Sequence, residues 1–143
     1  MSSLVLHLRL HDGRYHGEGD WPPSPARLFQ ALVAGAGLGG PLGEDERKAL
    51  GWLENLGAPL IAAPRVWQPR RGVLFYMPNN DSDSIGGDPL RMARIRTAKK
   101  WFRPCFFDAN VELLYAWPLT AAGEDADFAR MICSLAERLY QLG

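Results

Sequence analysis

WPPSPARLFQALVAGAG, residues 21–37, is the stretch that decides the fold, because it turns an extended chain into a helix. A residue before proline is disfavoured in the helical region, so residues 21–23 predict an extended approach. Ser24 is a good N-cap, and Pro25 falls on the first helical position, where a missing N–H costs nothing. The stretch therefore predicts that a helix begins at Pro25.

The predicted helix has one apolar face and a defined end. Its apolar side chains recur at the spacing of a buried stripe, at Leu28, Phe29, Leu32, Val33 and Ala36. Gly35 and Gly37 predict the end of the helix, since glycine commonly follows a helix C-terminus. Leucines at every second position from Leu4 to Leu10 predict a strand whose apolar face meets this stripe.

The rest of the chain adds helices and strands in alternation. Apolar periodicity predicts helices over 44–56 and 124–143 and strands over 59–67, 72–77 and 110–118. The turn-forming residues of PNNDSDSIGGDPL (78–90) and the cations that follow them predict a basic loop insertion over 79–104. This order is that of a split βαβ unit, so we expect a single α+β domain over 1–143 with a ferredoxin-like (RRM-like) fold.

The ferredoxin-like plan ends with a strand beside the first one, and no such strand follows the last predicted helix. We therefore expect the strand over 4–10 to have an unpaired edge. From this we expect the chain to be the N-terminal part of a longer protein, or its sheet to be completed by another chain.

Composition excludes several classes of protein and leaves others open. No apolar run approaches the roughly 20 residues that span a bilayer, and the N-terminus lacks the pattern of a signal peptide. The only cysteines, Cys105 and Cys133, are far apart, so we expect a reduced, cytoplasmic protein without a metal site. Acidic and basic residues balance at 16 each, so net charge neither indicates nor excludes a nucleic acid.

The distribution of charge is more informative than the total. RMARIRTAKKWFR, residues 91–103, has six cations in 13 residues and no acid, at Arg91, Arg94, Arg96, Lys99, Lys100 and Arg103. Trp101 and Phe102 stand among them, and Arg70 and Arg71 add to the charge. Cations that neutralise phosphates together with aromatics that stack on bases are typical of single-stranded nucleic acid binding. The alternative is a basic segment that is only solvated.

A second polar segment, HDGRYHGEGD over 11–20, brings Arg14, Tyr15 and His16 together in sequence. An imidazole beside a phenol and a guanidinium suits proton transfer and phosphate binding. His16, with Tyr15, is therefore the candidate for catalysis, although the same trio also occurs in ordinary surface loops.

Several of these segments resemble a known family. RYHGEGDWPPSPARLFQALVAG, YMPNNDSDSIGGDPLRMARIRTAK, VELLYAWP and LAERLYQLG resemble the N-terminal, Cas-five-like part of the type I-G (formerly I-U) CRISPR-associated protein. That protein is a fused Cas-five/Cas-six-like member of the repeat-associated RAMP superfamily. The resemblance covers most of 4–143, and the proline-rich and GGDP segments are its most specific parts.

The resemblance implies a subunit of the guide-RNA surveillance complex of antiviral defence. Its partners would be CRISPR RNA and the other subunits of that complex, without a cofactor. The resemblance also implies metal-independent cleavage of precursor CRISPR RNA, in which a 2′-hydroxyl attacks the adjacent phosphate. That chemistry is expected beyond Gly143, and segment 91–103 is the candidate for the basic excursion by which such subunits grip RNA.

Three hypotheses follow for the function of this chain. The first is an RNA-binding and assembly module that uses the cations and aromatics of 70–71 and 91–103. The second is an endoribonuclease with His16 as the proton carrier. The third is a ferredoxin-like domain that binds a small effector or a protein, with the basic segment solvated.

Overall fold

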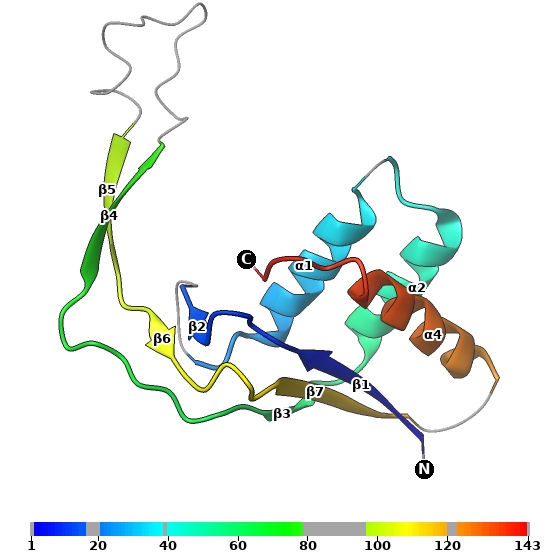
Figure 1. Cartoon of the computed structure of the whole chain (residues 1–143). Coiled ribbons are helices and arrows are strands. Elements are labelled where there is room, and N and C mark those ends of the chain that lie inside the picture. The colour runs from blue at the N-terminus through cyan, green and yellow to red at the C-terminus, as the bar shows by residue number, and fades with distance from the viewer. Residues whose placement is uncertain (1, 17–20, 39, 79–96, 120–122, 143) are drawn as a thin grey trace, which may run out of the picture.

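A three-stranded antiparallel sheet lies under three helices (Figure 1). The computed structural model describes residues 2–16, 21–38, 40–78, 97–119 and 123–142. In the sheet, β7 (Leu113–Leu119) lies between β1 (Ser2–Leu8) and β3 (Leu60–Ala62). The described residues therefore form a mixed α/β protein with antiparallel sheets.

The sheet buries one apolar face. Leu4 is opposite Trp117 and Leu6 is opposite Tyr115 in the register of β1 and β7, and all four side chains are buried. Since side chains alternate between the faces of a strand, the intervening Val5 lies on the other face, where it is 37% exposed. The alternation predicted for the first strand is confirmed, and among the described strands β1 pairs only with β7.

Three helices are described, α1 (Pro25–Ala36), α2 (Glu44–Asn55) and α4 (Glu124–Ala136), and all three lie on one side of the sheet (Figure 1). The fully buried side chains Leu28 and Leu32 of α1 join Ile132 and Leu135 of α4 in the core. Burial of such apolar side chains is the main stabilising contribution to a core of this kind.

The start of α1 is as predicted. Ser24 is the N-cap, its hydroxyl accepts a hydrogen bond from the backbone N–H of Arg27 at 3.3 Å, and Pro25 is in the first turn. The prediction for Gly35 is wrong, because Gly35 lies inside the helix and Gly37 is the C-cap. A Cβ at Gly35 would lie 2.9 Å from Leu139 Cδ2, so this glycine lets the C-terminal segment approach α1.

One long-range hydrogen bond joins the stretch before α1 to the centre of the sheet. The Tyr115 hydroxyl donates to the carbonyl oxygen of Pro23 at 2.6 Å, across 92 residues of sequence, and the Tyr115 side chain is fully buried. The peptide bond between Trp21 and Pro22 is cis, and the Trp21 indole N–H donates to the carbonyl oxygen of Pro64 at 2.9 Å. These contacts fix the path of the chain into α1.

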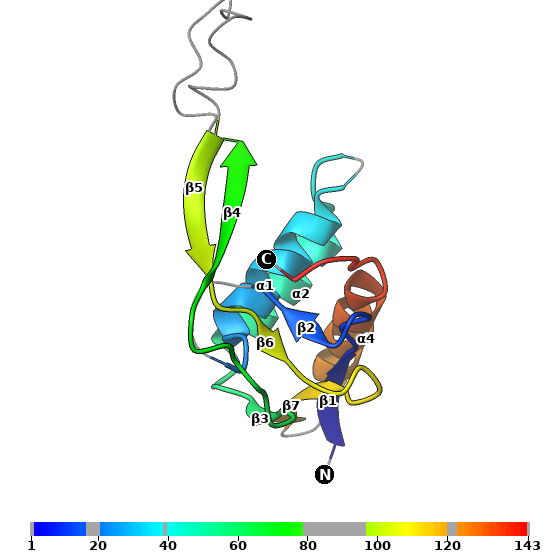
Figure 2. The ribbon, with the colours of Figure 1, turned by 60° about the vertical axis from the view of Figure 1, so that its left-hand side comes forward.

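A two-stranded hairpin projects away from the helices and the sheet (Figures 1 and 2). Its strands are β4 (Val73–Pro78) and β5 (Thr97–Phe102), which pair with each other in an antiparallel register. At its foot lies a second small sheet, β2 (Arg14–Tyr15) with β6 (Cys105–Phe106). Residues 97–102, predicted as loop, therefore form a strand.

Other element boundaries differ from the predictions. The strand predicted over 59–67 is reduced to β3. The strand predicted over 72–77 corresponds to β4, which belongs to a different sheet from β3. The last helix, predicted over 124–143, has Gly123 as its N-cap and ends at Ala136. Within it, the Asp125 carboxylate accepts a hydrogen bond from the Trp52 indole N–H at 3.0 Å, which joins α4 to α2.

Candidate nucleic-acid interface

The register of the hairpin separates its side chains into two faces. Tyr76 is opposite Lys99 and Leu74 is opposite Trp101, so these four residues share one face. Phe75 is opposite Lys100 and Val73 is opposite Phe102 on the other face. The two neighbouring lysines and the two neighbouring aromatics of segment 99–102 therefore point to opposite sides of the hairpin.

The first face carries a group of exposed side chains, Tyr76, Lys99 and Trp101, which we call the platform. Trp101 is 70% exposed and Tyr76 is 62% exposed, although a large aromatic side chain normally buries more of its surface. Lys99 Nζ lies 5.9 Å from the centre of the Tyr76 ring, within the range of a cation–π contact. The platform thus combines exposed aromatic rings with positive charge.

The opposite face connects the hairpin to the body. The rings of Phe75 and Phe102 meet edge to face at 5.6 Å, and the His16 ring approaches Phe75 edge to face at 5.9 Å. Such edge-to-face pairs stabilise beyond the area they bury. Phe102 is partly buried, so it serves the foot of the hairpin rather than the platform.

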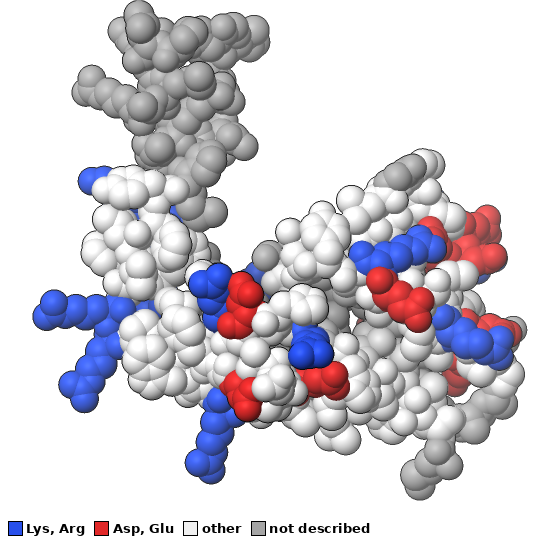
Figure 3. All heavy atoms as spheres, in the orientation of Figure 1, with Lys and Arg blue, Asp and Glu red and all other residues white. Residues whose placement is uncertain are grey.

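Further cations lie around the foot of the hairpin. Arg70, Arg71, Lys100 and Arg103 are exposed, and Arg103 Nε donates to the carbonyl oxygen of Pro69 at 3.4 Å. Within the described residues, none of these side chains is in an ion pair with Asp or Glu. On the face in Figure 3, Lys and Arg project from the hairpin side without acids, whereas the body carries both charges.

A second exposed aromatic pair lies below the hairpin, and nothing in the sequence predicted it. Trp67 and Phe106 exchange two backbone hydrogen bonds of 2.8 Å, and their rings lie 5.4 Å apart. Trp67 is 65% exposed. Tyr76 was missed as well, because alternation alone does not tell which face of an isolated hairpin lacks a cover.

The structure separates the three candidates of the polar loop. Tyr15 is only 6% exposed, its ring lies 5.7 Å from that of Trp21, and burial raises the pKa of its hydroxyl. His16 is exposed beside the hairpin, and Arg14 Nη2 lies 2.9 Å from Asp12 Oδ2. Tyr15 therefore belongs to the core, and only His16 and Arg14 are open to a ligand.

Some predicted site residues cannot be placed. Arg91, Arg94 and Arg96, with most of the predicted loop insertion over 79–104, lie outside the described residues. In the part of the chain that is described, no three His, Cys, Asp or Glu side chains gather as metal ligands would. None of the described helices has the length and apolarity needed to cross a bilayer.

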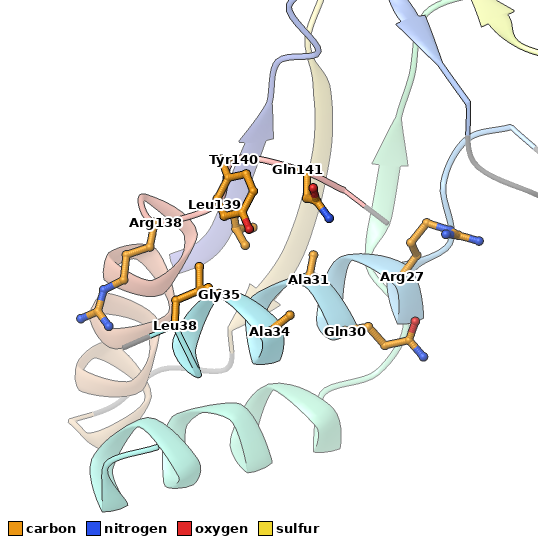
Figure 4. A pocket seen from close by; sticks show the side chains of 10 residues that line it. All are labelled: Arg27, Gln30, Ala31, Ala34, Gly35, Leu38, Arg138, Leu139, Tyr140 and Gln141. Atoms are coloured by element: carbon orange, nitrogen blue, oxygen red, sulfur yellow. The ribbon is translucent and has the colours of Figure 1, made fainter. Parts of the chain in front are cut away.

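The body also has a groove of about 270 Å³ between α1 and the C-terminal segment (Figure 4). Ala31, Ala34 and Gly35 of α1 form its floor, and Tyr140 comes from the segment after α4. Arg138 at its edge is held by Glu46, with Nη1 3.1 Å from Oε1. Arg27 lines the other end of the groove, so the groove combines small apolar side chains with two arginines and, unlike the hairpin, is cut into the body.

The fold and the hairpin together define the class of protein. The described residues make a small mixed α/β protein with one three-stranded antiparallel sheet, three helices over one face of it, and a projecting cationic hairpin with exposed aromatics. The family described as CRISPR-associated protein, GSU0054 family, matches residues 2–143, so the chain belongs to this family. This membership supports a role in CRISPR defence. No curated protein and no solved structure matches the chain.

Proposed function

We propose that the chain is an RNA-binding subunit of a type I CRISPR surveillance complex and holds CRISPR RNA on its hairpin. The observation that carries this proposal is the platform, where two exposed rings and a lysine without an ion pair to any described residue share one face. Exposed rings stack on bases of any sequence, and cations on the same element neutralise the adjacent phosphates. Segment 91–103, which the resemblance matches to an RNA-gripping excursion, includes β5.

Within the CRISPR-associated proteins, we assign the chain to the Cas-five-like part of the type I-G Cas-five/Cas-six fusion. The strand order supports this assignment. A ferredoxin-like sheet places its third strand between the first and second, antiparallel to both. β1, β7 and β3 follow this order, with α1 and α2 between β1 and β3 in the chain and α4 after β7.

The experiment is to measure single-stranded repeat RNA binding by fluorescence anisotropy over a series of salt concentrations. The double variant Lys99→Ala/Lys100→Ala should weaken binding and reduce the slope of log K against log salt by about 0.7 for each phosphate that is no longer neutralised. The variant Trp101→Ala should weaken binding by about 1–3 kcal/mol while it leaves the slope unchanged, because it removes stacking and no charge.

Lys48→Ala is the matched control. Lys48 is also an exposed lysine, but it lies on α2, where Nζ is 3.0 Å from Glu44 Oε1. This variant should bind RNA as the wild type does. If the hairpin variants also keep the wild-type affinity and salt slope, the hairpin is not the RNA-binding element. That result would support the hypothesis that the chain binds a protein or a small effector.

One observation favours a second candidate, metal-independent endoribonuclease activity. His16 is exposed at the foot of the hairpin, on the face opposite the platform, where an RNA strand that crosses from Lys100 to the body would pass. Incubation of the chain with repeat RNA in the presence of a chelator tests this candidate. A product with a 2′,3′-cyclic phosphate that His16→Ala abolishes would establish it, and uncut RNA would exclude it for this chain.

A further inference from the structure

An open depression of about 380 Å³ lies beside the foot of the hairpin. The chain after β1 forms one wall, β2 and the residue after it form another, and the C-terminal segment closes the third. Six polar side chains line it, from Arg9, His11, Asp12, Arg14, His16 and Tyr140. The sequence analysis singled out two of these residues, and the fold adds the other four.

The donors in this depression greatly outnumber the acceptors. Two guanidinium groups, two imidazoles and a phenol hydroxyl face a single carboxylate, that of Asp12. Guanidinium groups are donors only, and an imidazole offers at least one N–H in every protonation state. Phosphate oxygens accept such bonds, and guanidinium groups bind them in bidentate geometry. The chemistry of the lining therefore suits a phosphate group.

The single carboxylate, that of Asp12, does not prevent the neighbouring cations from binding a phosphate. Asp12 is paired with Arg14 at 2.9 Å, but the two side chains are 68% and 50% exposed. Ion pairs this exposed contribute little to stability, so the Arg14 guanidinium is free to turn toward a phosphate. Arg9 is exposed, and within the described residues it makes no ion pair.

The position of the depression links it to the hairpin. His16 lines the depression and also contacts Phe75, on the hairpin face that carries Lys100. Hydrogen-bond donors therefore continue from Lys100 across His16 to Arg14 and Arg9. An RNA strand that leaves the hairpin on this side would meet these groups next.

We propose that the depression binds a backbone phosphate of the RNA strand held by the hairpin, through Arg9, Arg14 and His11. This inference rests on the proposed function and adds a second contact point on the body. It also explains why four exposed donors of residues 9–16 and the Tyr140 hydroxyl lie around one hollow.

The test uses RNA with 2′-O-methyl groups, which cannot be cleaved by its own hydroxyls, in lengths of about 4 and about 12 nucleotides. The double variant Arg9→Gln/Arg14→Gln should bind the longer RNA about tenfold more weakly, with a salt slope reduced by about 0.7 for the one phosphate that is no longer neutralised. Binding of the shorter RNA, which fills the platform alone, should change little. The control Arg47→Gln/Arg130→Gln removes the same charge from α2 and α4 and should behave as the wild type.

The possible results separate the two proposals. If Arg9→Gln/Arg14→Gln binds both RNAs like the wild type while Trp101→Ala binds weakly, the depression is not an RNA site and the hairpin proposal stands. If neither variant differs from the wild type, both proposals fail. An NMR titration with inorganic phosphate covers the other source of this ligand: shifts of the His11 and His16 signals that RNA does not displace would assign the depression to free phosphate and overturn the inference.

Discussion

At the scale of single residues, Tyr115 shows how one side chain holds distant parts of the chain together. Its ring is buried at the centre of the sheet, and its hydroxyl satisfies the carbonyl of Pro23 just before α1. Burial raises the pKa of this hydroxyl to about 12, since the core disfavours the phenolate. The same residue therefore links the pleated core, the start of the first helix and the alkaline stability of the protein.

We predict that Tyr115→Phe lowers the free energy of unfolding by about 1–2 kcal/mol near neutral pH. The Pro23 carbonyl then loses its donor and receives no water in exchange, and an unsatisfied buried acceptor costs about this much. Urea unfolding followed by circular dichroism measures the change. Tyr140→Phe is the control, because Tyr140 is 74% exposed and its loss of a hydroxyl should have no effect. Equal stability of the two variants would contradict this account of Tyr115.

Stability should also fall at alkaline pH. An unfolded tyrosine releases its proton near pH 10 and Tyr115 does so near 12 in the folded state, so the unfolded chain binds fewer protons in this range. The contribution is complete below pH 10 and is lost between pH 10 and 12, on the order of 2–3 kcal/mol. The raised pKa of Tyr15 adds a loss in the same direction. The free energy of unfolding should fall between pH 9 and pH 11 in the wild type, and it should fall clearly less in Tyr115→Phe.

At the scale of elements, the hairpin separates two neighbouring aromatic residues by function. Phe102 packs on Phe75 at the foot, whereas Trp101 is exposed on the platform. Adjacent residues of a strand point to opposite faces, so a substitution at each one tests a different property. The hairpin therefore contains its own pair of matched variants.

We predict that Phe102→Ala loosens the hairpin and Trp101→Ala does not. Loss of the Phe102 ring removes the edge-to-face contact with Phe75 and the apolar area that anchors β5. Hydrogen exchange of the β4 and β5 amides should become at least severalfold faster in Phe102→Ala and stay near the wild-type rate in Trp101→Ala. Faster exchange in Trp101→Ala alone would show that the face assignments are reversed.

The start of α2 depends on one carboxylate with two partners. Glu46 Oε2 accepts a hydrogen bond from the backbone N–H of Gly43 at 3.0 Å, and its Oε1 lies 3.1 Å from Arg138 Nη1 near the end of α4. We predict that Glu46→Ala lowers the free energy of unfolding by about 1–2 kcal/mol, because it removes both the cap and the ion pair. In thermal melts, the control Glu44→Ala should change little, because Glu44 is 81% exposed. A larger effect of Glu44→Ala would refute this assignment.

The sequence predicted the helices and strands better than it predicted which of them lie side by side. Ser24 and Pro25 act through local backbone geometry, so the start of α1 followed directly from the residues there. Prediction of the platform would have required the register of β4 against β5, which brings Tyr76 beside Lys99 from a distant part of the sequence. The depression required Tyr140 of the C-terminal segment to meet residues 9–16, and periodicity carries no information on such a meeting. Tyr15 and His16 looked equivalent as neighbours, and only the fold shows that one is buried and the other exposed.

At the scale of the whole molecule, charge and packing are divided between two parts. The sheet and helices bury the apolar side chains and balance their charges in exposed pairs, such as Lys48 with Glu44. The hairpin buries little and, in its described residues, has cations without acids (Figures 1 and 3). An element that contributes little to the core and concentrates one charge is better suited to binding an anionic polymer than to stabilising the fold.

The most direct test of the claim that the hairpin binds RNA is photocrosslinking of repeat RNA that carries 4-thiouridine, followed by mass spectrometry of the crosslinked peptides. The account predicts adducts on the platform residues Tyr76 and Trp101, with loss of the Trp101 adduct in Trp101→Ala and no loss in Lys48→Ala. Adducts that fall on the groove between α1 and Tyr140 and spare the hairpin would contradict it.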